Sequence, residues 1–126
     1  MKMKTWLPFS AVLVCAFMTT SSLSAEASRR YVAMIFDDGP VQEQTQAFLE
    51  LLARENVHVS FAYVGQNVSA HPELARAAFE AGHELLNHSF THAHFKELDD
   101  AAIEREVRET QDAVERATGK VPQWFW

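Results

Sequence analysis

Residues 36–40 read FDDGP, and they follow the apolar run YVAMI at residues 31–35. A continuous apolar run is typical of a strand that is covered on both faces. Asp37 and Asp38 come at its end, where two ionised carboxylates side by side repel each other, and the Gly-Pro pair then turns the chain away. This pattern predicts a buried strand that ends at a bound cation, because a cation would relieve the repulsion.

The Asp doublet also has a simpler interpretation. Aspartates before a Gly-Pro pair often accept hydrogen bonds from nearby backbone amides in a turn. The cation site is therefore predicted only if other parts of the chain bring further ligands to the same place.

The composition limits the classes of protein and of ligand. The chain has 126 residues, 48% of them hydrophobic, and a formal net charge of −6, which is typical of one soluble globular domain or part of one. An acidic chain gives no reason to expect nucleic acid or an anionic membrane surface as a partner. The single cysteine, Cys15, lies near the N-terminus, so a metal site elsewhere must use His, Asp or Glu.

Residues 1–27 are predicted to be a secretory signal peptide. The cationic start MKMK precedes the apolar run WLPFSAVLVCAFM, and TTSSLSAEA then ends in a small-residue cleavage pattern at Ala27. The apolar run is too short for a spanning helix, although an uncleaved membrane anchor is the alternative interpretation. We therefore expect a secreted or periplasmic protein without a stable membrane anchor, from which Cys15 is removed with the signal.

Strand and helix patterns alternate along residues 28–126. This order predicts an α/β fold built from parallel β/α units with right-handed crossovers, either a small open sheet or part of a barrel. After the first strand, the expected elements are a helix at 41–55, a strand at 57–64, a loop at 65–70, a helix from Pro72 to Gly82, a strand at 83–87, a helix from Asp99 or Asp100 to Gly119, and the start of a strand at 123–126.

The chain stops at Trp126 within an apolar run. A natural end there would leave an exposed hydrophobic edge strand, which favours aggregation. We therefore expect residues 28–126 to be the N-terminal part of a longer domain, truncated at its C-terminus.

The segment NHSFTHAH at residues 87–94 supplies candidate metal ligands. Ligands in α/β folds bind beyond the carboxyl ends of the strands, where both this segment and the Asp doublet are predicted to lie. His88 and His92 are four residues apart, so one helical turn would place both imidazoles on one face. One carboxylate and two imidazoles would form an open metal site.

This histidine pair, too, could be an ordinary feature of a surface loop. Its position at a strand end, like that of the Asp doublet, favours the metal site over that interpretation. His94 is interpreted as a solvated loop residue. The remaining histidines and several aromatic residues are predicted to be structural: His58, His71, His83, Phe36, Phe61, Tyr63 and Phe79.

The FDDGP motif at 36–40 and the HSFTH motif at 88–92, with the segment between them, resemble the polysaccharide deacetylase family (NodB homology domain, carbohydrate esterase family 4). The corresponding family motifs are T/S-F-D-D-G-P and H-S/T-x-x-H. The resemblance runs from about Tyr31 to the chain end. It implies a distorted (β/α) barrel, of which this chain would hold an incomplete part.

The resemblance also implies a function and roles for residues. Asp37 would be the general base, and Asp38, His88 and His92 would hold a divalent metal, most often zinc. The implied activity is secreted, metal-dependent hydrolysis of N-acetyl or O-acetyl groups on a polysaccharide such as chitin, peptidoglycan or xylan. The alternative is a catalytically impaired protein that binds a metal or a glycan on the same scaffold.

Two later motifs of the family do not occur in these residues. One supplies an arginine that orients the base, and the other supplies a histidine that acts as general acid. Trp126 stands where the arginine is usual. We therefore expect the 126 residues alone to be inactive.

Overall fold

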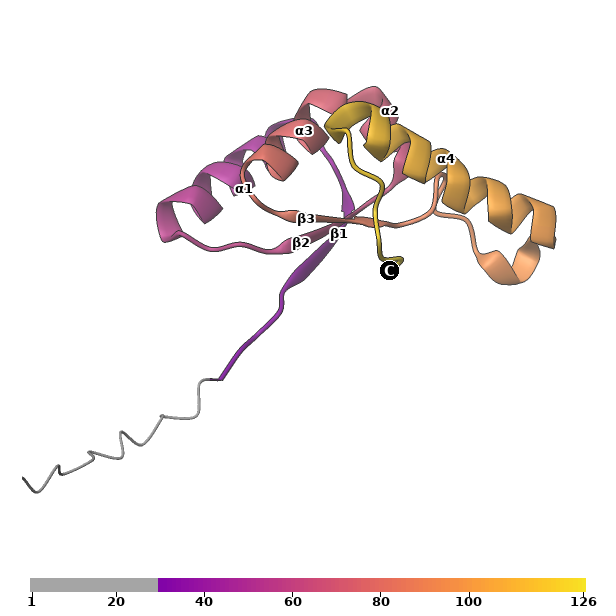
Figure 1. Cartoon of the computed structure of the whole chain (residues 1–126), viewed down its shortest axis with the longest axis horizontal. Coiled ribbons are helices and arrows are strands. Elements are labelled where there is room, and N and C mark those ends of the chain that lie inside the picture. Colours follow the sequence, from indigo (N-terminus) through magenta and orange to yellow (C-terminus); the bar gives the residue numbers. More distant parts are fainter. Residues whose placement is uncertain (1–29) are drawn as a thin grey trace, which may run out of the picture. The chain divides into compact units, whose positions relative to one another are not determined.

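The computed structural model describes residues 30–126, so the predicted signal peptide lies outside the described residues. Strands and helices alternate along the chain (Figure 1). The elements are β1 (Ile35–Gly39), α1 (Gln42–Glu55), β2 (Ser60–Tyr63), α2 (Gly65–Ala70), α3 (Pro72–Glu80), β3 (Glu84–Asn87), the 3-10 helix η1 (Phe95–Glu97) and α4 (Asp100–Thr118).

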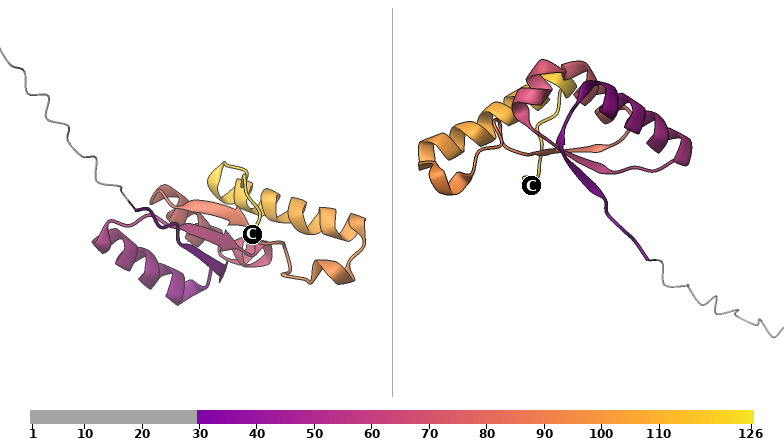
Figure 2. Two further views of the ribbon diagram at one scale, coloured as in Figure 1. Left: turned by 90° about the horizontal axis from the view of Figure 1, so that it is seen from below. Right: turned by 180° about the vertical axis from the view of Figure 1, so that it is seen from behind.

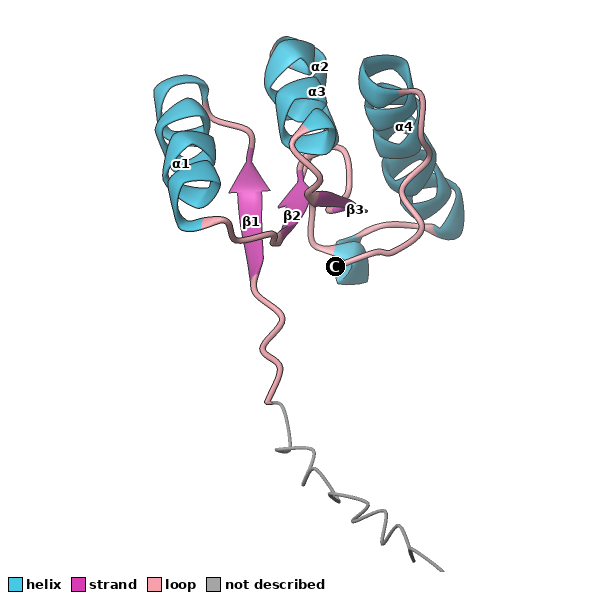
Figure 3. Cartoon of the chain, turned by 60° about the vertical axis from the view of Figure 1, so that its left-hand side comes forward, coloured by secondary structure: helices cyan, strands magenta, loops and turns pink. Residues whose placement is uncertain are grey.

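The three strands form a parallel sheet in the order β1-β2-β3. Helices α1, α3 and α4 lie side by side on one face of this sheet (Figure 3). The predicted strand at 123–126 forms only one parallel bridge, between Asn87 and Phe125, in the described part of the chain. The predicted order of parallel β/α units is thus confirmed.

The hydrophobic core lies between the sheet and the helices. Its strand residues include Phe61 and Tyr63, and its helix residues include Val68, Ala78 and Val114. Helix α4 contributes one apolar face to this core. It has a typical capping residue at each end. The Asp99 carboxylate accepts a hydrogen bond from the Ala102 amide at 2.7 Å, as an N-cap residue does, and Gly119 ends the helix with φ 75°.

The prediction of a loop at 65–70 was wrong, because these residues form α2. Val68 is fully buried in this helix. A Cβ atom at Gly65 would lie 2.6 Å from Thr110 Oγ1, so the glycine lets the first turn pack closely against α4. Tertiary packing therefore forms a helix where the polar sequence indicates none.

The first strand begins later than predicted and is not covered on both faces. It starts at Ile35, whereas Tyr31 and Val32 are 83% and 86% exposed. Strand β1 is an edge strand among the three described, and the described helices cover one face only. The second strand is also shorter than predicted, Ser60–Tyr63.

Among the described residues, no helix has both the length and the apolar character needed to cross a membrane.

Candidate metal centre

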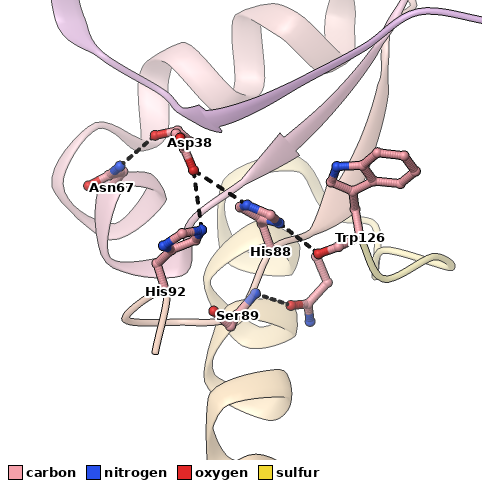
Figure 4. Close-up of polar contacts among 7 residues, drawn as sticks. Asp38, Asn67, His88, Ser89, His92 and Trp126 are labelled. Atoms are coloured by element: carbon pink, nitrogen blue, oxygen red, sulfur yellow. Dashed lines mark hydrogen bonds and ion pairs between the residues drawn. The ribbon is translucent and has the colours of Figure 1, made fainter. Parts of the chain in front are cut away.

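A β-bulge positions the Asp doublet. Phe36 pairs with Phe61, but Gly39 pairs with Tyr63, so β1 has one more residue than β2 between these two pairs. Asp38 lies in the bulge with φ 65°. Such a bulge re-aims side chains, and here it directs Asp38 toward the end of β3 (Figure 4).

Gly39 allows the bulge to close against β2. A Cβ atom at this position would lie only 2.7 Å from Tyr63 Cε1, closer than carbon atoms approach in folded proteins. The glycine of FDDGP therefore has a packing role beside the carboxylates.

The loop at residues 88–92, which we call the ligand loop, carries the two histidines. The predicted helical turn is not formed, because Ser89 and His92 have left-handed backbone angles, φ 57° and 61°. The imidazoles nevertheless lie together, with ring centroids 4.8 Å apart. The His88 amide donates a hydrogen bond to Tyr63 O at 3.2 Å, which continues the pairing between β2 and β3.

Asp38, His88 and His92 converge on one point (Figure 4). Asp38 Oδ1 lies 3.4 Å from His88 Nε2 and 3.4 Å from His92 Nε2. Ligand atoms at about 2.0 to 2.1 Å from a tetrahedral Zn²⁺ are about 3.3 to 3.4 Å from one another. The spacing and the carboxylate-imidazole donor set therefore fit a divalent metal ion.

Backbone strain is concentrated at this centre. Of the four described non-glycine residues with positive φ, three are Asp38, Ser89 and His92, and the fourth is Asn56 at the end of α1. Non-glycine residues adopt this conformation rarely, and when they do they often lie at functional sites.

Further hydrogen bonds hold the ligand residues on atoms that do not face the metal position. Sequence spacing did not predict these contacts. His88 Nδ1 lies 2.7 Å from the Trp126 carbonyl oxygen. Asn67 Nδ2 donates to the Asp38 carbonyl oxygen at 3.0 Å, and Asn87 Oδ1 accepts from the Ser89 amide at 3.0 Å. Outer hydrogen bonds of this kind fix ring orientation and backbone position in metal sites.

Asp37 is exposed and lines a cavity of about 280 Å³ together with Asp38, Phe48 and Tyr63. No described residue forms a hydrogen bond or ion pair with its carboxylate. The Asp38 side chain is 70% exposed and that of His88 is 13% exposed, so the centre opens to solvent on the Asp38 side.

The histidines outside the centre have other surroundings. His83 is buried, and its Nδ1 accepts a hydrogen bond from the Val59 amide at 3.3 Å. His71 pairs with Glu73 at 3.6 Å, and His58 and His94 are exposed. None of the four belongs to the cluster of ligand atoms formed by Asp38 and the ligand loop.

The sequence model of the family described as polysaccharide deacetylase matches residues 24–126. The chain belongs to the polysaccharide deacetylase family. Two curated relatives are similar to it. A chitooligosaccharide deacetylase from Rhizobium leguminosarum bv. trifolii is 37% identical over 97 residues, which are 77% of this chain and 45% of that protein. A peptidoglycan-N-acetylglucosamine deacetylase from Bacillus cereus is 28% identical over 121 residues, 96% of this chain and 42% of that protein.

Solved structures of polysaccharide deacetylases resemble the fold. A family 4 carbohydrate esterase from Streptomyces lividans, in complex with acetate, is 37% identical with a TM-score of 0.72 over 75% of this chain and 49% of that one. A family 4 acetyl xylan esterase from Clostridium thermocellum, in complex with a cobalt ion, is 30% identical with a TM-score of 0.70 over 74% of this chain and 46% of that one.

These neighbours have a (β/α) barrel fold, so the parallel sheet described here is a partial barrel of the same family. The chain spans less than half of the length of the two curated relatives, 45% and 42%. Enzymes of this family are metalloenzymes, which agrees with the donor set of the candidate centre.

Proposed function

We propose that the protein is a secreted, metal-dependent carbohydrate deacetylase that hydrolyses N-acetyl, or O-acetyl, groups of a polysaccharide. The observation that carries this proposal is the convergence of Asp38, His88 and His92, whose ligand atoms lie within 4.8 Å of one another, with Asp37 next to Asp38 in the sequence. The predicted signal peptide supports secretion, since polymers such as chitin, peptidoglycan and xylan lie outside the cytoplasm.

In this proposal Asp38, His88 and His92 hold the divalent metal, and zinc suits a site of one carboxylate and two imidazoles. The bound metal supplies Lewis-acid activation of water and of the acetyl carbonyl. Asp37 accepts the proton of the attacking water, because it precedes the ligand Asp38 in the chain, lines a cavity together with it, and its carboxylate has no partner among the described residues. The doublet thus divides metal binding and proton transfer between neighbouring residues.

The substrate is proposed to be an acetylated polysaccharide or oligosaccharide. Support comes from the relatives that are named for chitooligosaccharides and for peptidoglycan N-acetylglucosamine. The exposed Asp38 side of the centre also leaves room for a polymer to approach.

Acetate release from a panel of acetylated glycans by the whole protein tests the proposal. Activity should disappear with a chelator and return with Zn²⁺. Asp37→Asn should lower the rate about 10²- to 10⁴-fold while Zn²⁺ affinity is kept. His88→Ala and His92→Ala should weaken Zn²⁺ binding in calorimetry, and unchanged affinity in both would refute the metal centre.

A wild-type protein that binds Zn²⁺ or a glycan without releasing acetate would instead support the alternative, a catalytically impaired binding protein. Trp126 in the position where the family usually has arginine is the feature that favours this outcome.

A further inference from the structure

Glu106 in α4 binds the ligand loop between its two histidines. Its Oε2 atom accepts hydrogen bonds from the amides of Phe90 and Thr91, each at 2.7 Å. Its Oε1 atom accepts one from Thr91 Oγ1, also at 2.7 Å. One carboxylate from a helix that follows the loop therefore holds two consecutive loop residues. Figure 2 shows α4 beside β3, from which the loop emerges.

The amides of Phe90 and Thr91 have no backbone hydrogen-bond partner in a described strand or helix, because the ligand loop is irregular. The carbonyl groups of the loop are bound on the opposite side. Gly65 N donates to Ser89 O at 2.9 Å, and Gln66 N donates to Phe90 O at 3.0 Å. The start of α2 thus holds the loop carbonyls, and Glu106 holds the loop amides. Together these contacts bind both the amide and the carbonyl of Phe90, midway between His88 and His92.

Glu106 is suited to this task as a charged acceptor. Its partial burial opposes ionisation, but the hydrogen bonds from Thr91 and Phe90 outweigh this and lower the pKa of the carboxyl. Hydrogen bonds to an ionised carboxylate are about twice as strong as neutral ones. Three such bonds offset the cost of keeping Ser89 and His92 in left-handed conformations, which neither residue adopts readily.

We propose that Glu106 is a positioning residue of the metal centre, which holds His92 at the spacing from His88 and Asp38 that a divalent ion requires. The inference rests on the proposed function, since it takes Asp38, His88 and His92 as the ligands. Glu106 contacts neither the ligand side chains nor the cavity beside Asp37, so it acts only through the backbone of the ligand loop and the Thr91 hydroxyl.

Zn²⁺ affinity of the metal-free whole protein, measured by competition with a chromophoric chelator, tests this role. Glu106→Ala should weaken binding about 10- to 100-fold, the usual effect of removing an outer partner of a metal ligand. Glu106→Gln should also weaken binding, because the amide nitrogen cannot accept a hydrogen bond. The effect should be smaller than that of Glu106→Ala, because the amide oxygen still accepts hydrogen bonds. Glu109→Gln removes the same charge from an exposed position of α4 and should leave the affinity unchanged.

Amide hydrogen exchange in the metal-free protein separates positioning from general stability. Glu106→Ala should speed exchange at Phe90 and Thr91 while protection in α3 and β2 stays as in the wild type. If Glu106→Ala does not fold, Thr91→Val tests the role of Glu106 instead. This variant removes only the hydroxyl contact to Glu106 and should still weaken Zn²⁺ binding measurably.

Two results overturn the inference alone: a folded Glu106→Ala protein with wild-type Zn²⁺ affinity, or, where that variant does not fold, a Thr91→Val protein with wild-type affinity. A different result would refute the proposed metal centre itself. If the wild type binds no Zn²⁺, or if His88→Ala and His92→Ala bind it as the wild type does, the ligand assignment fails and the role of Glu106 fails with it.

Discussion

The Nδ1 atom of His88 lies 2.7 Å from the backbone carbonyl oxygen of Trp126. A carbonyl oxygen can only accept a hydrogen bond, so this contact places the proton on Nδ1 and leaves Nε2 free to bind a metal. The segment after α4 therefore sets the tautomer of a candidate ligand that directly follows β3, and it does so with a main-chain atom.

Main-chain rather than side-chain changes at Trp126 should therefore affect the centre. Trp126→Pro removes the amide that donates to Asn87 O at 3.0 Å and should displace the carbonyl that binds His88. We expect Zn²⁺ affinity to fall about 10-fold. Trp126→Phe keeps the backbone and should bind as the wild type does. A proline variant with unchanged affinity would show that His88 needs no such partner.

Gly39→Ala should destabilise the protein. The new Cβ would meet Tyr63 Cε1 at 2.7 Å, and overpacking of this kind costs about 1 to 3 kcal/mol. Urea unfolding measures the loss in free energy of unfolding. In a Tyr63→Ala background the same substitution should cost clearly less, because the clashing ring is gone. An equal cost in both backgrounds would mean that contact with Tyr63 is not the cause.

Much of the site was predictable because topology, rather than detailed packing, determines it. The carboxyl ends of parallel strands meet at one edge of a sheet. The positions of FDDGP and HSFTH after two apolar runs were therefore enough to predict that the Asp doublet would lie near His88 and His92, whereas the choice of Asp38 as the ligand rested on the family resemblance. The structure brings these three together, and the order of parallel β/α units needed only the alternation of patterns.

The conformations that achieve this convergence depend on residues distant in sequence. The helical turn predicted for the ligand loop fails because Glu106, on a later helix, holds the loop amides in another arrangement. Helix α2 was missed because Gly65 and Val68 pack against elements that no local pattern reveals. The bulge at Asp38 likewise follows from pairing with β2.

Tyr63→Phe should stabilise the protein. The Tyr63 hydroxyl is buried and has no hydrogen-bond partner among the described residues, and burial raises the pKa of this hydroxyl far above its ordinary value of 10.0. Removing an unsatisfied buried polar group gains about 1 kcal/mol. The urea midpoint should rise without a change in slope, whereas Tyr31→Phe, at an exposed position, should have no effect. A loss of stability in Tyr63→Phe would indicate a partner for the hydroxyl.

Stability should decrease as the pH falls below 6.5, in part because of His83. Burial, and then the nearby His58, lower the pKa of His83 from its ordinary value of 6.5. The unfolded chain therefore binds more protons here than the folded chain does, and the free energy of unfolding rises with pH across this range. Protonation of Nδ1 would also break its bond from the Val59 amide.

The measurement is urea unfolding of the metal-free protein from pH 7.5 down to pH 5. The difference in free energy of unfolding between wild type and His83→Asn should shrink toward low pH, because the variant lacks this titration. A difference that stays constant with pH would contradict the assignment.

Strand β2 lies between β1 and β3, and main-chain hydrogen bonds at its carboxyl end reach the segments that carry the ligands on both sides. Val64 N donates to Gly39 O at 2.9 Å, and Tyr63 O accepts from His88 N at 3.2 Å. The distance between the two segments that would hold the ion is therefore set by backbone N–H and C=O groups. Every amino acid except proline provides both groups. Substitution of the Val64 side chain in a related protein would thus be poor evidence that its centre has been lost.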